Sequence, residues 1–268
     1  MVTESSTPAS DQFNLRFGGT QRLYGKAGVE KLRAAHVCVV GIGGVGSWAA
    51  EALARTAIGE ITLIDLDDIC TTNINRQIHA LTSTVGKLKV EVMAERILQI
   101  NPDCKVNLID DFYTSDNPSD YINKSMNWVV DAIDSAPTKA ALIAYCRSNK
   151  IRVIATGAAG GLIDPTRLQV VDLSRTPNDP LARNVSSLLE RQFGYDPKRR
   201  RGFRVPCVSS DEQAVYPKPD GSVCQQKSVM DEGTRLDCAG GFGSSTMVTA
   251  TFGFIAAATV VDKIVTKE

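Results

Sequence analysis

Residues 36–68 read HVCVVGIGGVGSWAAEALARTAIGEITLIDLDD and decide the fold of the chain. The apolar run His36–Val40 predicts a buried strand, and a glycine cluster follows it at once. A helical stretch beginning at Ser47 comes next, and a second apolar run ends in Asp65. Strand, glycine turn, helix, strand and acid, in this order, predict the first βαβ unit of a nucleotide-binding sheet.

Each glycine of the cluster has a steric or conformational task. Gly41 allows the tight turn that leaves the strand, and Gly43 removes a side chain where backbone must approach a phosphate. Gly46 allows the helix to pack closely on the strand. The N–H groups at the helix start, near Gly44, can then bind an anion, and Asp65 can accept hydrogen bonds from ribose hydroxyls. We therefore expect a nucleotide site here rather than a purely structural turn.

Composition and cysteine usage narrow the class of protein. The chain has 268 residues, of which 43% are hydrophobic, so it can bury a large core. Its formal net charge is zero, so any nucleic-acid binding must rest on local basic patches. The seven cysteines form no CxxC pair and follow no export signal, which favours reduced thiols in the cytoplasm.

The two ends of the chain differ sharply in composition. Residues 1–13 are polar and predict a disordered leader. Met247–Val265 is uncharged over its first fifteen residues, which is shorter than the ~20 residues that a membrane span needs. We expect a buried helix there, and membrane association through this helix is the alternative.

Polar side chains follow the second strand, at the position where ligands bind in α/β sheets. An arginine there can hold phosphate with two hydrogen bonds, although a polar surface loop would have a similar composition. The candidates for nucleotide binding in this segment are Asp67, Asn73, Asn75, Arg76 and Gln77. Lys87 stands at the start of the expected helix Gly86–Leu98. The helix dipole repels a lysine at that end unless an anion is bound, so Lys87 is a further phosphate candidate.

Two carboxylates, Asp131 and Asp134, follow the apolar run that begins at Trp128. Mg²⁺ prefers oxygen ligands and commonly takes one or two carboxylates together with phosphate oxygens. We therefore expect Asp134 to hold Mg²⁺ and Asp131 to lie in the nucleotide site. The alternative is that Asp134 or Ser135 simply caps the following helix.

Strand and helix patterns alternate through the first part of the chain and change after residue 161. Further strands are expected at Lys105–Ile109, Trp128–Ile133, Ile151–Ala155 and Arg167–Asp172. The fold class is therefore α/β, with a Rossmann-like, mostly parallel sheet, helices on both faces, and a C-terminal extension of mixed strands and a buried helix. We expect residues 14–165 to form the nucleotide-binding core and residues 166–268 to be a substrate-facing part of the same domain.

Three further groups carry functional hypotheses beside structural ones. Arg16 and Arg22 lie in Asn14–Leu32, which reads as a loop followed by a short helix, and are either solvated charges or cations offered to a phosphate site. The densest basic run is either a solvated loop or an RNA contact, and it comprises Lys198, Arg199, Arg200, Arg201 and Arg204. Cys238 precedes a turn into the last helix and is either a packed thiol or a reactive one.

Several motifs together resemble a known superfamily. GIGGVGSWAAEALARTAIGEITLIDLDD, NINRQ, VGKLK and DAIDS, in this order and spacing, resemble the ubiquitin-activating-enzyme superfamily, whose bacterial members include the ThiF and MoeB adenylyltransferases. The segments RFGGTQRLYG, NRQIHAL, DPLARN, VYPKPDGSVC and DCAGGFGSSTMVTATFGF resemble, more narrowly, the tRNA threonylcarbamoyladenosine dehydratase family. The glycine motif together with the NINRQ loop, the following lysine and the two carboxylates of DAIDS favours ATP over NAD as the nucleotide.

The resemblance implies an assignment for the candidate residues. It places ATP on the glycine turn with its ribose on Asp65, phosphates on Arg76 and Lys87, and Mg²⁺ on Asp134. It also implies adenylation of the threonyl carboxylate of threonylcarbamoyladenosine, next to the anticodon of tRNA, followed by cyclisation. The alternatives are a sulfur-carrier-protein adenylyltransferase and a non-catalytic nucleotide-binding partner of a cysteine desulfurase.

Two features depart from the superfamily pattern. A homodimer is implied, in which an arginine on the N-terminal arm reaches the partner's site. That position is Gly19 here, so Arg16 or Arg22 would have to replace the arginine. ThiF and MoeB proteins usually carry two CxxC pairs for structural zinc, whereas Cys207, Cys224 and Cys238 form no such spacing, so no zinc is expected.

Overall fold

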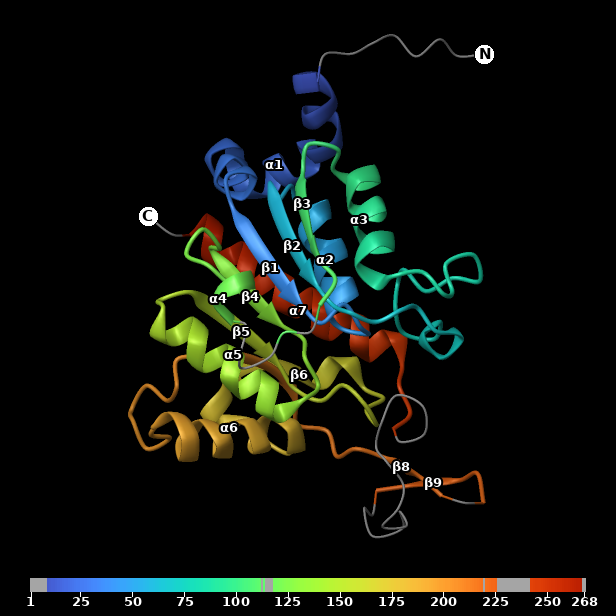
Figure 1. Ribbon diagram of the computed structural model, residues 1–268, viewed down its shortest axis with the longest axis vertical. Helices are drawn as coiled ribbons and strands as arrows, with labels where there is room; N and C mark the ends of the chain where they lie inside the picture. The colour runs from blue at the N-terminus through green and yellow to red at the C-terminus, as the bar shows by residue number, and fades with distance from the viewer. Residues whose placement is uncertain (1–8, 112, 114–117, 219, 226–241, 267–268) are drawn as a thin grey trace.

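The computed structural model describes residues 9–111, 113, 118–218, 220–225 and 242–266, which build a seven-stranded sheet (Figure 1). The strand order is β3-β2-β1-β4-β5-β7-β6, and all neighbouring strands are parallel except β6 and β7. The strands are β1 His36–Val40, β2 Glu60–Ile64, β3 Lys105–Ile109, β4 Trp128–Asp131, β5 Arg152–Thr156, β6 Leu168–Asp172 and β7 Pro206–Ser210. The predicted mostly parallel α/β sheet is confirmed.

Helices cover both faces of the sheet, because successive side chains of each central strand point to opposite sides. Val37 and Val39 of β1 pack with α1, α2, α3 and α7, whereas Cys38 and Val40 pack with α5 and α6. Figure 1 shows α7 crossing behind the strands, with α5 and α6 on the opposite side. The helices are α1 Ala9–Arg33, α2 Gly46–Arg55, α3 Lys89–Ile100, α4 Pro118–Tyr121, α5 Ala136–Ser148, α6 Pro180–Phe193 and α7 Thr246–Val265.

The N-terminal region is more helical than the sequence indicates. The loop expected at the start of Asn14–Leu32 belongs to α1, which kinks at Gly25 where φ is +73°. Glycine lowers helix propensity by ~1 kcal/mol per residue, so packing stabilises this helix, through buried side chains such as Phe17 and Leu32. Of the leader expected over residues 1–13, residues 9–13 are helical and residues 1–8 lie outside the described residues.

The last helix, α7, is the buried helix that the sequence predicts. Val248, Phe252 and Val260 are fully buried in the core. A Cβ at Gly253 would lie 2.5 Å from the Val45 carbonyl oxygen, so α7 approaches the start of α2 closely. Within the described residues, α7 alone is long and apolar enough to cross a membrane, but 56% of its most apolar window is buried in the protein, which is typical of a core helix.

The C-terminal part continues the same sheet. β7 joins β5 in parallel, and β6 pairs antiparallel with β7 at the edge. A second, two-stranded ribbon consists of β8 Tyr216–Pro217 and β9 Val223–Cys224, and the Lys218 N–H donates to the Ser222 carbonyl at 2.8 Å between them. The mixed strands expected after residue 165 are therefore present.

The strand order reverses beside β1. The chain leaves β1 to reach β2 on one side, and later enters β4 on the other side. Ligands bind at such a reversal, outside the carboxyl ends of the strands. Gly41 follows β1 and Ala132 follows β4 at this edge of the sheet.

Candidate nucleotide-binding site

The glycine turn admits no side chain at two of its positions. Gly41 has a φ of +88°, which favours glycine, and its N–H donates to the Ile64 carbonyl at 2.9 Å. A Cβ at Gly46 would lie 1.8 Å from the Gly41 carbonyl oxygen, so α2 begins directly against the turn. This close packing fixes the direction in which α2 starts.

The turn presents backbone donors that the described part of the protein does not use. The N–H groups of Gly43, Gly44 and Val45 donate to no acceptor there, and no side chain caps α2. Every helix leaves its first N–H groups without intrahelical partners, and such groups bind anions. Gly43 also leaves open space, since the nearest atom to a Cβ there would be Gln77 Nε2 at 3.9 Å. The turn can therefore accommodate a phosphate.

Asp65 joins the end of β2 to this turn. Its Oδ2 accepts the Ile42 N–H at 2.6 Å, and its Oδ1 accepts the Asp67 N–H at 2.9 Å. Burial raises the pKa of the Asp65 carboxyl, and the nearby Lys89 opposes this rise. Each carboxylate oxygen has two lone pairs, so both oxygens keep a free site for a ribose hydroxyl.

The lysine beside these carboxylates is Lys89 rather than Lys87. Lys89 Nζ lies 2.6 Å from Asp67 Oδ2 and 3.8 Å from Asp65 Oδ1, and its side chain is buried. Lys87 is exposed and precedes α3, which begins at Lys89 and not at Gly86 as expected. Lys89 is therefore the lysine that stands at the start of a helix, where the helix dipole repels it unless an anion lies nearby.

Arg76 lies over the glycine turn. A Cβ at Gly44 would be 3.3 Å from Arg76 Cγ and Cδ. The guanidinium Nη1 donates to the Thr72 carbonyl at 2.6 Å and to Asn75 Oδ1 at 3.1 Å. Within the described residues Arg76 forms no ion pair, so its charge is available to an anion bound on the turn.

Side chains from distant segments hold the loop that carries Arg76. Trp48 Nε1 donates to the Arg76 carbonyl at 2.9 Å, and the Thr246 hydroxyl donates to the Asn75 carbonyl. Asn75 Nδ2 donates to the Ser244 carbonyl at 3.2 Å. No local sequence pattern links Trp48, Ser244 and Thr246 to residues 72–77, so their part in this loop could not be predicted from the sequence.

The other two polar candidates in this loop are buried. Asn73 Oδ1 accepts the Cys70 N–H at 3.0 Å, which shapes the turn. Gln77 is 6% exposed, and its Oε1 has no hydrogen-bond partner within the described residues. Gln77 therefore keeps an unused acceptor beside Gly43.

The two carboxylates after β4 do not form the pair that the sequence predicts. Asp131 is fully buried, and its Oδ1 accepts from Lys139 Nζ at 2.8 Å, while burial raises the pKa of the Asp131 carboxyl. Asp134 is exposed and makes no hydrogen bond within the described residues. Asp131 thus holds β4 to α5 instead of facing a nucleotide, because Lys139 lies one helical turn inside α5.

A helix cap does not account for Asp134 either. The residue before α5 is Ser135, and its hydroxyl contacts the Thr138 hydroxyl at 3.0 Å rather than a backbone N–H. Within the residues that the structure describes, no group of three or more His, Cys, Asp or Glu side chains could hold a metal ion. Mg²⁺ bound together with phosphates needs only one or two carboxylates, and Asp134 is free to provide one.

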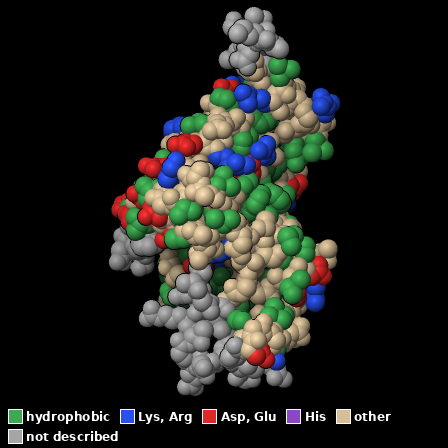
Figure 2. All heavy atoms as spheres, turned by 90° about the vertical axis from the view of Figure 1, so that its right-hand side faces the viewer, with side chains coloured by type: hydrophobic (Ala, Val, Ile, Leu, Met, Phe, Trp, Pro, Cys, Tyr) green, Lys and Arg blue, Asp and Glu red, His purple; other side chains and the backbone are tan. Residues whose placement is uncertain are grey.

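The N-terminal arginines lie away from this turn within the chain. Arg16 Nη1 donates to the Gln99 carbonyl at 3.5 Å, near the end of α3. α3 starts beside Asp65 and its twelve residues extend ~18 Å, so Arg16 is about one helix length from the site. Arg22 lies over Gly18 of its own helix. Figure 2 shows several Lys and Arg side chains over the upper half of one face, with Asp, Glu and hydrophobic side chains among them.

The structure describes the basic run but not the last cysteine. Of the five cations of the basic run, the four at positions 198–201 are exposed on turns, and Arg204 is exposed with a φ of +57°. Of the aromatic residues beside the run, Phe203 is buried and packs edge-to-face on Tyr195 at 5.2 Å, so it cannot stack on a base. Cys238 lies outside the described residues, and its reactivity stays a prediction.

Comparisons with known proteins agree with this geometry. The chain matches the ThiF family model over residues 19–267. It is 56% identical over 262 residues to the tRNA threonylcarbamoyladenosine dehydratase of Escherichia coli K12, covering 98% of both chains. A solved structure of TcdA (CsdL) superposes with a TM-score of 0.89 at 54% identity, covering 97% of each chain. The E. coli TcdA structure in complex with ATP superposes with a TM-score of 0.85 at 52% identity, covering 96% of this chain and 97% of that one. The chain therefore belongs to the ThiF family and, within it, to the tRNA threonylcarbamoyladenosine dehydratases.

Proposed function

We propose that this protein uses ATP to dehydrate the threonylcarbamoyl group of threonylcarbamoyladenosine, next to the anticodon of tRNA, and so closes it into a ring. The glycine turn carries this proposal, because among the described residues its backbone donors have no acceptor and lie under the Arg76 side chain, which forms no ion pair there. The E. coli relative that is 56% identical is named for this reaction, and another structure of that family contains ATP.

Two chemical steps give this product. A carboxylate is a poor electrophile, so one carboxylate oxygen first attacks the α-phosphorus of ATP and expels pyrophosphate, which leaves an acyl adenylate. The carbamoyl nitrogen of the same side chain then attacks the activated carbonyl, loses its proton, and releases AMP with the former carboxylate oxygen. Tethering the nucleophile to the carbonyl makes this second step intramolecular and fast.

The residues of the site fit these steps. The N–H groups of Gly43 and Gly44, with Arg76, would stabilise negative charge that develops on the phosphates. Asp65 would accept the ribose hydroxyls, and Lys89 would hold Asp65 and Asp67 in place through the contacts at 3.8 and 2.6 Å. Lys89, and not Lys87, would therefore be the lysine of the site, and it would act on the carboxylates rather than directly on the phosphates.

Mg²⁺ fits the donor set through Asp134, whose carboxylate is exposed at the carboxyl end of β4. The ion would supply positive charge to the phosphates of ATP. Asn73, Asn75 and Gln77 would shape the surrounding loop, since the first is buried and the second is bonded to Ser244.

An isotope experiment tests the reaction. Incubation of the protein with MgATP and tRNA carrying threonylcarbamoyladenosine should lower the mass of the nucleoside by one water. With ¹⁸O in the threonyl carboxylate, one label should appear in AMP. Asp134→Ala and Arg76→Ala should abolish both signals and keep the circular dichroism spectrum. Pyrophosphate exchange that needs a sulfur-carrier protein instead of tRNA would contradict the proposal, as would nucleotide binding without turnover.

We propose that the protein works as a cytoplasmic homodimer in which Arg16 or Arg22 serves the partner's site. Arg16 lies far from the glycine turn of its own chain, and Leu15 and Leu23 on the same helix are each 74% exposed. Light scattering should give twice the mass of one chain, and Arg16→Ala together with Arg22→Ala should slow turnover. A cysteine desulfurase system is a further candidate partner, which co-purification with such an enzyme would test.

A further inference from the structure

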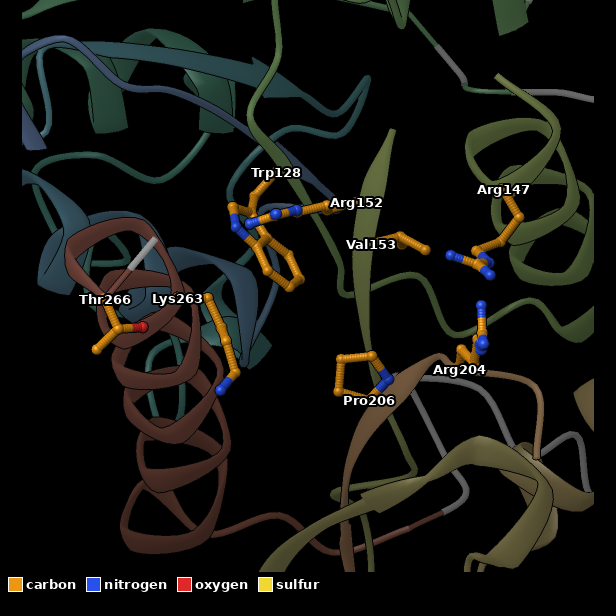
Figure 3. Close-up of a pocket in the computed structure, with 8 residues that line it drawn as sticks. All are labelled: Trp128, Arg147, Arg152, Val153, Arg204, Pro206, Lys263 and Thr266. Atoms are coloured by element: carbon orange, nitrogen blue, oxygen red, sulfur yellow. The ribbon is translucent and has the colours of Figure 1, made fainter. Parts of the chain in front are cut away.

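A cationic cavity lies at the edge of the sheet opposite to the glycine turn. It has a volume of about 320 Å³, and the residues that define its chemistry are Trp128, Arg147, Arg152, Arg204, Pro206 and Lys263 (Figure 3). Trp128, Arg152 and Pro206 are the first residues of β4, β5 and β7, so the cavity lies at the amino ends of these strands. The glycine turn lies at the opposite, carboxyl ends of the strands, and β4, which runs between the two edges, is four residues or ~10 Å long.

The arginines of this cavity lack carboxylate partners. Within the described residues Arg147, Arg152 and Arg204 form no ion pair, and Lys263 has only Asp262 at 3.4 Å. Arg152 lies over the Trp128 ring at 5.7 Å, and Arg147 contacts the neutral Tyr195 hydroxyl. Figure 3 shows Arg147 and Arg204 pointing toward one another across the cavity. Two guanidinium groups repel each other at short range unless an anion lies between them.

The loop before β7 is built to hold Arg204 in this position. Asp172 accepts the N–H groups of Phe203 and Val205, at 2.9 and 3.2 Å, on either side of Arg204. Arg204 itself has a φ of +57°, a strained conformation for a residue with a side chain. Asp172 thus fixes the backbone, while the Arg204 side chain has no hydrogen-bond or ion-pair partner among the described residues.

We propose that this cavity is a second phosphate site, which holds a backbone phosphate of the tRNA away from the reacting nucleotide. This inference rests on the proposed function, because that function supplies an RNA as the polyanion. Arginine holds phosphate with two parallel hydrogen bonds, which suits a facing pair such as Arg147 and Arg204. Arg204 also ends the basic run that begins at Lys198, so this run adjoins the cavity in the sequence.

Charge-removing and charge-retaining variants test the proposal. Arg147→Gln/Arg204→Gln removes both facing guanidinium groups, and Arg147→Lys/Arg204→Lys keeps the charge without the planar fork. Lys124→Gln is the matched control, because Lys124 is exposed in the turn before β4, at the same edge of the sheet and outside the cavity. Fluorescence anisotropy of labelled tRNA at several KCl concentrations gives the Kd and its salt dependence.

The glutamine pair should raise the Kd for tRNA by about tenfold or more, and should reduce the slope of log K against log [KCl] by ~0.9 for each lost contact. The lysine pair should keep most of the slope. The KM for tRNA should rise while kcat at saturating tRNA and the Kd for ATP stay unchanged, because the cavity is separate from the reacting groups.

The proposal would be overturned if the glutamine pair had a Kd for tRNA and a salt slope within twofold of the wild-type values, or if the lysine pair lost ATP binding. It would also be overturned if inorganic phosphate or polyglutamate bound in the cavity without any effect on tRNA binding. If the wild-type protein binds tRNA through these arginines but removes no water from it, the proposed function fails and the phosphate site stands.

Discussion

Lys139→Met should lower the free energy of unfolding by ~3–5 kcal/mol, because it leaves the Asp131 carboxylate buried without its cation. Lys139 Nζ lies 2.8 Å from Asp131 Oδ1 and 3.0 Å from the Asp131 carbonyl oxygen, and both side chains are fully buried. Thr156 also donates to that carbonyl, at 3.2 Å. The carbonyl therefore keeps a donor in the variant, and the unpaired carboxylate accounts for most of the loss.

This loss should depend on pH. Burial raises the pKa of Asp131 above 3.8, and Lys139 opposes the rise. Without the lysine, native Asp131 holds its proton to a still higher pH, whereas in the unfolded chain it ionises near its ordinary value. The free energy of unfolding then falls as the pH rises from about 4 through the new native pKa, by ~1.4 kcal/mol for each unit between the two values. The variant should be more stable at pH 5 than at pH 8.

Urea denaturation at pH 5 and pH 8, followed by circular dichroism, measures both effects. Asp131→Asn/Lys139→Met is the matched control, because an amide oxygen can still accept the Ile133 N–H, now at 3.2 Å, without a buried charge. This double variant should recover most of the stability and lose the pH dependence. The reasoning is refuted if Lys139→Met costs less than ~1 kcal/mol, or if the double variant is less stable than the single one.

Three further predictions concern the nucleotide site. Gly46→Ala should cost ~1–3 kcal/mol and weaken ATP binding in calorimetry, since its Cβ would lie 1.8 Å from a carbonyl oxygen; unchanged affinity would contradict it. Trp48→Phe removes the hydrogen bond to the Arg76 carbonyl, which is worth ~1 kcal/mol, so it should weaken ATP binding about fivefold. Phe254→Leu changes only the ring beside Trp48 and should leave ATP binding unchanged. Lys89→Met should weaken ATP binding at least about tenfold and Lys87→Met less than about twofold; the reverse order would restore the sequence-based assignment.

The sequence predicts the parts of the fold that short-range patterns specify. The predicted strand His36–Val40 has the same first and last residues as β1, and the predicted strand Lys105–Ile109 has the same first and last residues as β3. β1 is buried along its whole length, and for such a strand a short apolar run followed by turn residues is a sufficient signal, whereas β3 is partly exposed and mixes polar with apolar side chains. Gly41 and Gly46 are also explained locally, because their constraints arise within one strand–turn–helix unit.

The partners of the charged residues were harder to predict, because they depend on where helices begin and how they pack. Lys87 and Lys89 are two residues apart, and the start of α3 decides which of them reaches Asp65. Asp131 sits in a strand that is buried on both faces, so its carboxylate needs a cation from inside the protein. Lys139 on α5 supplies this cation. Its buried position, one turn inside the helix, is what distinguishes it from a surface lysine.

The C-terminal helix is part of the nucleotide site, although its sequence suggests only a core or membrane helix. The Thr246 hydroxyl and the Ser244 carbonyl hold Asn75 across about 170 residues of chain. α7 also packs on the start of α2 through Gly253, on the helix that carries Trp48. The glycine turn is thus fixed locally, whereas the loop that brings Arg76 over it is held by Thr246 of α7, by Ser244 just before that helix and by Trp48 of α2. A change in α7 can therefore alter phosphate binding without touching a glycine, and the two halves of the chain must fold together for the site to form.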